Sequence, residues 1–365
     1  MLPEYPYITR FAAISGGHGG NRRTRQIAEL LVGIGVELVD LSLYKRAMKR
    51  PLTSELFSPD QDFDSLYGFN QHILSQLDLD QNLSEAVMEA GIKGAVVDDP
   101  VFFPKTMRVL ADRNIPVVSV IHNIESFLPR TLQVKPQWKL LQEEICVVSK
   151  SSLCVTIARE DAWFLRNNGV ECYNYPYFPS EDSEAMLAKV RIARRKSKKK
   201  FCLCMGTAYN PPTLFGMKTL INNWPEITGE NIPLIVAGYG VDQFFGRENV
   251  PEMVNVAGGV SDAVLGDILT ECGACVLHQD VGAGALTKIP ELLRAGIPVV
   301  ASQHAARSYG AFDGVYEYQD MKEIPKLLMR AMQRDCAPAS LPKVDGKQLL
   351  AHVHRVFKSR HHSEQ

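Results

Sequence analysis

ACVLHQDVGAGALTKIPELLRAGIPVVAS, residues 274–302, changes its hydrophobic pattern twice. It begins as a continuous apolar run, passes through the turn Gly282–Gly284, takes up helical spacing, and returns to an apolar run after Gly296. Apolar runs rich in β-branched residues on either side of a helix predict a βαβ unit, whose two strands are parallel.

The same alternation continues over most of the 365 residues. Helical patterns separate the apolar runs, for example over 24–34 and 132–148. The predicted fold class is therefore α/β, with two doubly wound, Rossmann-like domains in tandem. We expect strands near 7–15, 36–40, 94–98, 116–121, 152–157, 170–174, 201–205, 232–237, 253–256, 274–278 and 297–301.

A proline-containing segment separates the two predicted domains. The sequence YNYPYFPSED at 173–182 contains two prolines, which disfavour regular structure and indicate a linker. We place an N-terminal domain at 1–177 and a C-terminal domain at 178–346. The apolar residues of 347–362 have helical spacing, so this segment is expected to form a helix that packs back on the first domain.

Composition excludes several classes of protein. The chain has 40 Lys+Arg against 41 Asp+Glu, a formal charge of −1, so nucleic acid is not an expected partner. It has neither an apolar stretch long enough to span a membrane nor a basic leader, which predicts a cytoplasmic protein. Cys272 and Cys275 form a CxxC within an apolar run, which we interpret as structural, and we expect no metal.

A run of basic residues interrupts this balance. KVRIARRKSKKK at 189–200 has eight basic residues among twelve. One interpretation is a solvated helix end before the strand at 201–205. The other is weak peripheral contact with an anionic membrane surface at the inner face, which suits a lipid-linked substrate.

Ligands of parallel sheets bind beyond the carboxyl ends of the strands, so binding residues are expected in the loops that follow strands. SGGHGG at 15–20 is a glycine-rich turn before a helix, where backbone N–H groups can approach an anion or a sugar. His18 in this turn is a candidate general base, and a structural role is equally open. Asp98 and Asp99 follow another strand; they either orient a histidine or a sugar hydroxyl, or one of them caps the helix that begins at Pro100.

Two further loops contain polar groups that suit a nucleotide sugar. His122, with Asn123 and Glu125, places an imidazole, an amide and a carboxylate after one strand; its alternative is a buried, satisfied histidine. In 274–302, Lys288 and Glu291 are three apart and hence neighbours near the start of a helix. A lysine suits a diphosphate and a glutamate suits ribose hydroxyls, whereas a surface ion pair would leave the glycine-rich entrance unexplained.

Taken together, these motifs resemble the GT-B glycosyltransferases, in particular the retaining, family-4-like group. The resemblance is specific in 274–302 and looser over the rest of the chain, where it includes MGTAYNPPTLFGMKTLINNWPEI at 205–227. It implies two domains facing across a cleft and, as catalytic residues, His122, His18 and Asp98. The residues that it implies for donor binding are Gly16, Gly17, Gly19, Gly206, Thr207, Gly238, Gly282, Ala283, Gly284, Lys288 and Glu291.

The resemblance implies transfer of a sugar from a nucleotide-diphosphate sugar to a saccharide, lipid-linked or protein acceptor. The reaction is expected to be retaining and metal-independent, with the nucleotide sugar as co-substrate and no other cofactor. Two positions depart from the family pattern: Ala283 stands where a first carboxylate is common, and Thr207 where an arginine is common.

The sequence is also compatible with three alternative functions. An inverting transferase would use His18 as a base oriented by Asp98 or Asp99. The two departures fit a catalytically weak, nucleotide-sugar-binding partner subunit. A sugar-nucleotide 2-epimerase would share the architecture and need no acceptor.

Overall fold

The chain is described by a computed structural model that covers residues 1–10, 19–41, 78–128, 138–198, 200–229, 232–246, 250–333 and 345–358. Its contacts divide it into two compact units. Unit 1 is Met1–Glu125, Trp138–Tyr175 and Val344–Gln365, and unit 2 is Ser126–Gln137 and Pro176–Lys343.

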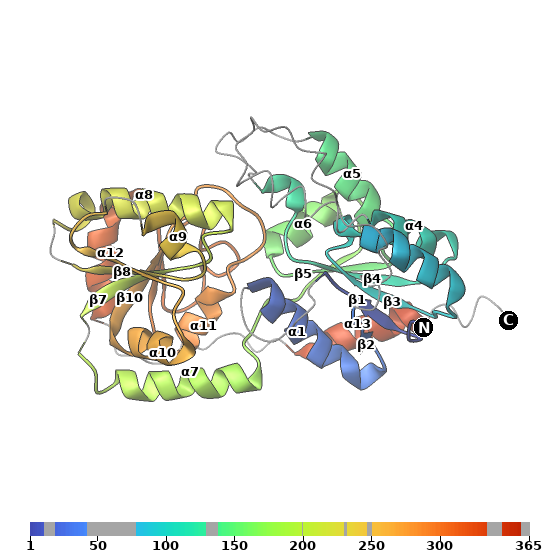
Figure 1. Ribbon diagram of the computed structural model, residues 1–365, viewed down its shortest axis with the longest axis horizontal. Coiled ribbons are helices and arrows are strands. Elements are labelled where there is room, and N and C mark those ends of the chain that lie inside the picture. The colour runs from blue at the N-terminus through green and yellow to red at the C-terminus, as the bar shows by residue number, and fades with distance from the viewer. Residues whose placement is uncertain are drawn as a thin grey trace. The chain divides into compact units, whose positions relative to one another are not determined.

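Unit 1 is built on a six-stranded parallel sheet with the order β2-β1-β3-β4-β5-β6 (Figure 1). The strands β3, β4 and β5 are fully buried, as expected for a parallel sheet covered on both faces. Its strands are β1 Pro6–Ile8, β2 Glu37–Leu38, β3 Ala95–Asp98, β4 Val117–Ile121, β5 Leu153–Thr156 and β6 Cys172–Asn174.

Helices cover the sheet of unit 1 on both faces. One hydrophobic cluster joins α1 and α13 to β1, β3, β4 and β5, and Phe357 of α13 packs against Tyr5 with 5.2 Å between ring centroids. A second cluster joins residues 78–89, which are helical, and α4 to the opposite face. Besides residues 78–89, the helices of this unit in the described part of the chain are α1 Gly19–Leu31, α4 Pro104–Asp112, α5 Trp138–Val148, α6 Arg159–Asn167 and α13 Gly346–Lys358, with short 3-10 turns at η1 Val32–Ile34 and η3 Pro100–Phe102. A third 3-10 turn, η4 Glu125–Phe127, begins at the last residue of the first segment of unit 1.

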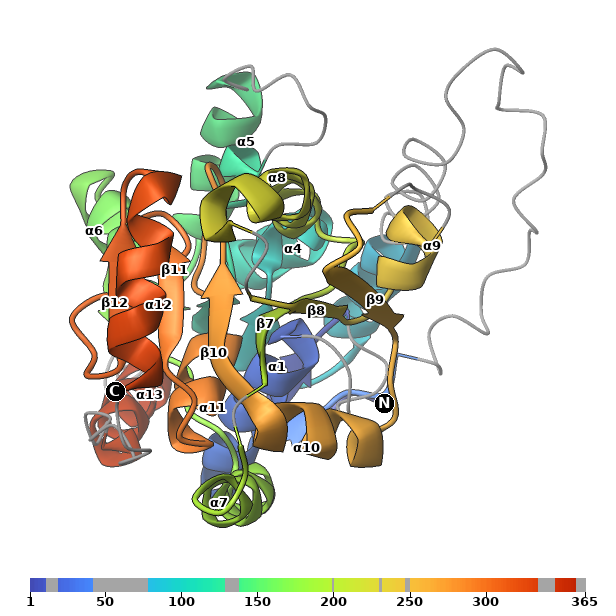
Figure 2. The same ribbon diagram turned by 90° about the vertical axis from the view of Figure 1, so that its left-hand side faces the viewer.

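Unit 2 repeats this design with the strand order β12-β11-β10-β7-β8-β9, again all parallel (Figure 2). The order reverses between β10 and β7, which in open α/β sheets is the position where ligands bind. The strands are β7 Phe201–Met205, β8 Leu234–Ala237, β9 Val254–Gly258, β10 Cys272–Leu277, β11 Val299–Ser302 and β12 Val315–Tyr318.

Two hydrophobic clusters fill the two faces of this second sheet. One contains side chains of α7, α10 and α11, and the other contains side chains of α8, α9 and α12. Cys272 and Cys275 are buried in β10, which agrees with the structural interpretation of the CxxC. The helices are α7 Glu181–Arg194, α8 Pro211–Thr228, α9 Val241–Phe245, α10 Asp262–Glu271, α11 Lys288–Arg294 and α12 Ile324–Met332, with a 3-10 turn at η5 Met321–Glu323.

The predicted α/β class with two doubly wound domains is confirmed. The strand β12 was not predicted, because VYEY at 315–318 is short and only its last residue, Tyr318, is buried. The expected strand at 7–15 is β1 at Pro6–Ile8, and residues 11–15 lie outside the described part of the chain.

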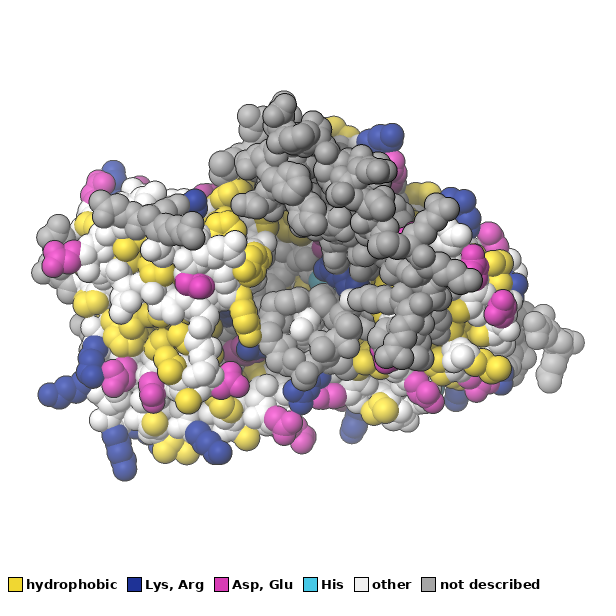
Figure 3. All heavy atoms as spheres, viewed as in Figure 1, with side chains coloured by type: hydrophobic (Ala, Val, Ile, Leu, Met, Phe, Trp, Pro, Cys, Tyr) yellow, Lys and Arg dark blue, Asp and Glu magenta, His cyan; other side chains and the backbone are white. Residues whose placement is uncertain are grey.

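The basic run at 189–200 contains structural as well as surface cations. Arg194 is 1% exposed, and its guanidinium donates to the carbonyls of Leu269, Cys272 and Gly296. Lys200 pairs with Glu271. On the face shown in Figure 3, both basic and acidic side chains are spread over the described surface. No helix in the described ranges combines the length and hydrophobicity needed to cross a bilayer.

Candidate functional site

Two side chains from the loop after β11 form hydrogen bonds with the turn that follows β10. His304 Nε2 lies 3.0 Å from the carbonyl oxygen of Gly282, and Arg307 donates to the carbonyls of Ala283 at 2.5 Å and Gly284 at 2.7 Å. Three successive carbonyls are thus bonded within the protein. Gly282 has φ +139°, a conformation that a residue with a side chain rarely adopts.

Lys288, the first residue of α11, reaches the carboxyl end of β7. Its Nζ lies 3.5 Å from the position that a Cβ atom on Gly206 would occupy. A Cβ on Gly238, the residue after β8, would collide with the carbonyl group of Gly206. The three loops after β7, β8 and β10 therefore meet at one edge of the sheet, and a cation lies beside backbone that only glycine allows to approach so closely.

Glu291 lies one turn further along α11 and is only 8% exposed. Its Oε1 accepts a hydrogen bond of 2.7 Å from the hydroxyl of Tyr177, which is buried. Tyr177 comes from the proline-containing segment at the start of unit 2, and the sequence pattern there gave no signal for this contact. Its hydroxyl fixes the position of the carboxylate, and Glu291 is buried rather than part of an exposed surface pair.

Removal of this hydroxyl is expected to cost stability. Tyr177→Phe leaves a buried carboxylate short of one donor, which should lower the free energy of unfolding of unit 2 by about 1–3 kcal/mol. The matched control is Tyr209→Phe, because the hydroxyl of Tyr209 also donates to a side-chain oxygen at 2.8 Å, that of Gln243, but on an exposed surface. Hydrogen exchange of amides in β10 and β11 measures both; equal effects of the two variants would contradict the prediction.

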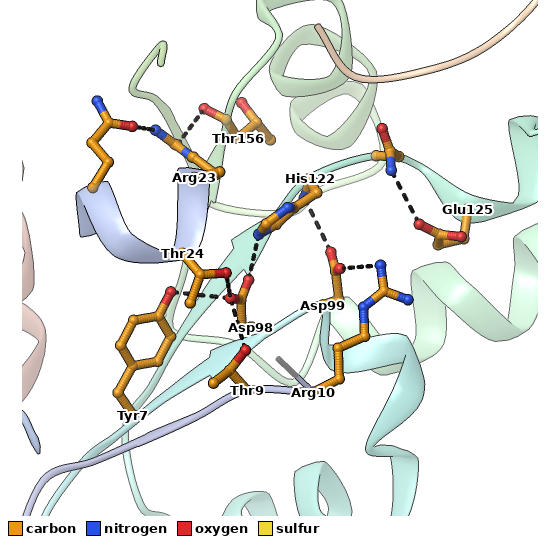
Figure 4. Close-up of polar contacts among 12 residues, drawn as sticks. Tyr7, Thr9, Arg10, Arg23, Thr24, Asp98, Asp99, His122, Glu125 and Thr156 are labelled. Carbon is orange, nitrogen blue, oxygen red and sulfur yellow. Dashed lines mark hydrogen bonds and ion pairs between the residues drawn. The ribbon is translucent and has the colours of Figure 1, made fainter. Parts of the chain in front are cut away.

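In unit 1 the carboxylate of Asp98, at the end of β3, is the centre of a buried network (Figure 4). Its Oδ1 lies 2.6 Å from His122 Nε2. Its Oδ2 accepts from three hydroxyl groups, those of Tyr7 at 3.2 Å, Thr9 at 3.2 Å and Thr24 at 2.5 Å. Asp98 and its three hydroxyl partners are 0% exposed and His122 is 6% exposed.

Asp99 supports the same histidine from the other side. Its Oδ1 accepts from the backbone N–H of His122 at 3.2 Å, and its Oδ2 lies 3.0 Å from Arg10, whose guanidinium also stacks on the ring of Phe102. The alternative that Asp98 or Asp99 caps the helix at Pro100 is wrong within the described residues: Asp99 occupies the N-cap position of η3, but its side chain makes no capping hydrogen bond. The carboxylate is turned to Arg10 and His122 instead.

The charges of this network favour an ionised Asp98 and a protonated His122. Burial alone would raise the pKa of Asp98, but the adjacent His122 and the hydrogen bonds from His122 and Thr24 lower it overall. Burial likewise tends to lower the pKa of His122, and the negative charges of Asp98 and Asp99 outweigh it, so the net shift is upward. His122 is therefore held closer to the imidazolium state than an ordinary histidine.

The ligand atoms of Asp98, Asp99 and His122 lie within 4.8 Å of one another, and these residue types can hold a divalent cation. In this arrangement the donors are bonded to each other and to Arg10, whose positive charge opposes the binding of a metal cation.

The neighbouring loop holds the other two polar residues proposed from the sequence. Asn123 donates to Glu125 at 3.2 Å. Burial raises the pKa of Glu125, and Arg10 opposes that shift.

The other residues proposed from the sequence are placed as follows. Gly16, Gly17 and His18 lie outside the described residues, and Gly19 is the first residue of α1. Thr207 follows Gly206 in the loop after β7. Sequence reasoning missed Tyr177, His304, Arg307 and the three hydroxyls around Asp98, because their contacts join residues far apart in the chain.

No protein-family model matches the chain, and a search of curated proteins gives no match. Solved structures do resemble it. Sucrose-phosphate synthase from Thermosynechococcus elongatus superposes with a TM-score of 0.62 at 13% identity, over 97% of this chain and 95% of that one. HepE from Anabaena in complex with UDP has a TM-score of 0.57 at 13% identity, over 100% and 99% of the two chains.

The α,α-trehalose 6-phosphate synthase of Burkholderia multivorans is also similar, with a TM-score of 0.51 at 12% identity, over 80% of this chain and 76% of that one. These similarities extend over most of each chain and concern structures with the GT-B fold. At such low identity they establish the fold alone, and they confirm the predicted GT-B architecture.

Proposed function

We propose that the chain is a glycosyltransferase that moves a sugar from a nucleotide-diphosphate sugar to an acceptor. The observation that carries the proposal is the meeting of Lys288, the Gly206 loop and the Gly282 turn at one edge of the unit 2 sheet. Proteins of the same fold act as sucrose-phosphate and trehalose 6-phosphate synthases, and HepE binds UDP.

Each group at this edge has a role in donor binding. Transfer requires stabilisation of the departing diphosphate, and a lysine beside glycine backbone supplies a positive charge and N–H donors without a metal. Glu291, oriented by Tyr177, accepts hydrogen bonds from ribose hydroxyls. Gly238 and Gly284 keep their loops free of side chains where the donor approaches.

In unit 1, His122 is proposed to contact the transferred sugar. Its bond to Asp98 fixes the ring, and the raised pKa favours donation of a proton or hydrogen bond over abstraction. This supports a retaining reaction, in which the leaving phosphate accepts the acceptor's proton. The inverting alternative needs Asp98 or Asp99 to orient His18. The Asp98 carboxylate is already bonded to His122 and three hydroxyls, and Asp99 is bonded to the backbone N–H of His122 and to Arg10.

A second candidate is a nucleotide-sugar-binding partner subunit. It rests on Ala283 and Thr207, neither of which supplies the charged side chain common at that position in the family. Donor binding without turnover is the behaviour that separates this candidate from the enzyme.

The test is a panel of UDP-, ADP-, GDP- and dTDP-linked sugars. Thermal shift identifies the nucleotide sugar that stabilises the chain, since a ligand that binds only the native state raises the unfolding temperature. That donor is then incubated with saccharide, lipid-linked and peptide acceptors in the presence of EDTA, and release of nucleoside diphosphate and the anomeric configuration are followed by NMR. Transfer with retained configuration is the expected result. Stabilisation without turnover supports the partner subunit, and no stabilisation by any donor contradicts both.

A further inference from the structure

Two tyrosines lie exposed at the carboxyl ends of adjacent strands in unit 2. Tyr209 follows β7 and is 63% exposed, and Tyr239 follows β8 and is 59% exposed. Their loops are otherwise well packed: Ala208 is 1% exposed, and its N–H donates to the carbonyl of Tyr239 at 2.8 Å. That bond ties together the two loops, each of which carries an exposed tyrosine.

The ring of Tyr209 is fixed in position by three contacts. Its hydroxyl donates to Gln243 Oε1 at 2.8 Å. A Cβ on Gly240 would lie 3.0 Å from two carbons of the ring, so the ring packs directly on glycine backbone. Phe244 meets it edge-on, with 6.0 Å between centroids and 74° between planes. An aromatic group ordered in this way binds a flat ligand with little loss of side-chain entropy.

This pair is continuous with the proposed diphosphate site. Tyr239 lies between Gly238 and Gly240, and Gly238 packs so closely on Gly206 that no side chain fits between them. Gly206 in turn lies beside Lys288 Nζ. One edge of the sheet thus carries a cation and glycine backbone next to two exposed aromatic residues, chemistry that suits a diphosphate and a flat base of one ligand.

We infer that Tyr209 and Tyr239 form a stacking platform for the nucleobase of the donor. The inference rests on the proposed function and adds to it the groups that bind the base. Stacking uses the π-face that every base has, so the platform selects for an aromatic base and gives little discrimination among bases. The hydroxyl of Tyr209 is bonded to Gln243, which leaves the exposed part of the ring as its contribution.

The experiment compares ligands with and without a base by isothermal titration. UDP, ADP and GDP are titrated against ribose 5-diphosphate, which contains the pentose and diphosphate only. Tyr209→Ala and Tyr239→Ala are each expected to weaken nucleotide binding about tenfold, equal to about 1.4 kcal/mol. Binding of ribose 5-diphosphate should stay within about twofold of the wild type, because its contacts lie at Lys288 and the glycine loops.

Two controls define the outcome. Tyr239→Phe keeps the ring and should retain wild-type affinity, and Trp163→Ala removes an equally exposed aromatic side chain from α6 of unit 1 and should change nothing. Unchanged nucleotide affinity in both alanine variants overturns the platform while the donor site stands. Equal weakening of ribose 5-diphosphate overturns it too, since the loss then comes from disturbed loops. A wild-type chain that binds none of these ligands overturns the platform and the donor site together.

Discussion

Replacement of Lys288 by methionine is expected to lower kcat/KM for the nucleotide sugar at least about a hundredfold, which is about 2.7 kcal/mol of lost transition-state stabilisation. The physical reason is that Lys288 Nζ lies beside the Gly206 backbone, the proposed position of the leaving diphosphate, on which negative charge develops during transfer. Methionine has a similar length and leaves the apolar packing of α11 in place, so the variant removes the charge with little change of shape.

The matched control is Lys326→Met, an exposed lysine on α12 of the same unit. It removes the same charge from the protein without touching the glycine loops and should leave kcat/KM within about twofold. Steady-state kinetics on both variants measure the difference. If Lys288→Met and Lys326→Met behave alike, the proposed diphosphate site is wrong.

The pattern of the sequence was sufficient to predict the fold because the fold depends on local periodicity. Buried strands such as FCLCM at 201–205 appear as short apolar runs, and α11 appears as helical spacing between two of them. The order of such elements predicts a parallel sheet whatever the identity of each side chain. β12 escaped prediction because an edge strand of four residues has too short a pattern.

The candidate site was predictable only in part, for a different reason. Lys288 and Glu291 share one helix, so their spacing alone places them together. The partners of Asp98 come from positions 74 to 91 residues away for Thr24, Thr9 and Tyr7, and no local pattern connects them. The same holds for Tyr177 and Glu291, which are 114 residues apart. The local sequence suggested that Asp99 caps a helix, but its carboxylate pairs with Arg10, 89 residues away, instead.

Substitution of Asp98 by asparagine is expected to destabilise unit 1 by about 3–5 kcal/mol, since it leaves the buried His122 without its counter-charge. Asparagine has the volume of aspartate, so cavity formation contributes little. Asp112→Asn, at the exposed end of α4, is the control and should change stability by less than about 0.5 kcal/mol. Hydrogen exchange of β3 and β4 amides reports the free energy of unit 1 itself.

The pH dependence of the same measurement distinguishes the ion pair from a neutral hydrogen bond. The pKa of His122 is raised, so its contribution is fully present below the ordinary histidine value and is lost as pH rises through the raised pKa. The pKa of Asp98 is lowered, so its contribution is present above the ordinary aspartate value and is lost as pH falls through the lowered pKa. Wild-type protection, corrected for intrinsic exchange rates, should therefore peak between the two pKa values and decline on the alkaline side.

In Asp98→Asn the alkaline decline should weaken or reverse. Burial then acts on His122 with only Asp99 opposing it, so the pKa of His122 falls and protonation in acid opposes folding. If stability declined with rising pH as steeply in this variant as in the wild type, Asp98 would not be what raises the pKa of His122. The assignment of an imidazolium–carboxylate ion pair would then be wrong. A flattened slope with the expected loss of protection ties both effects to the carboxylate of Asp98, which lies 2.6 Å from His122 Nε2.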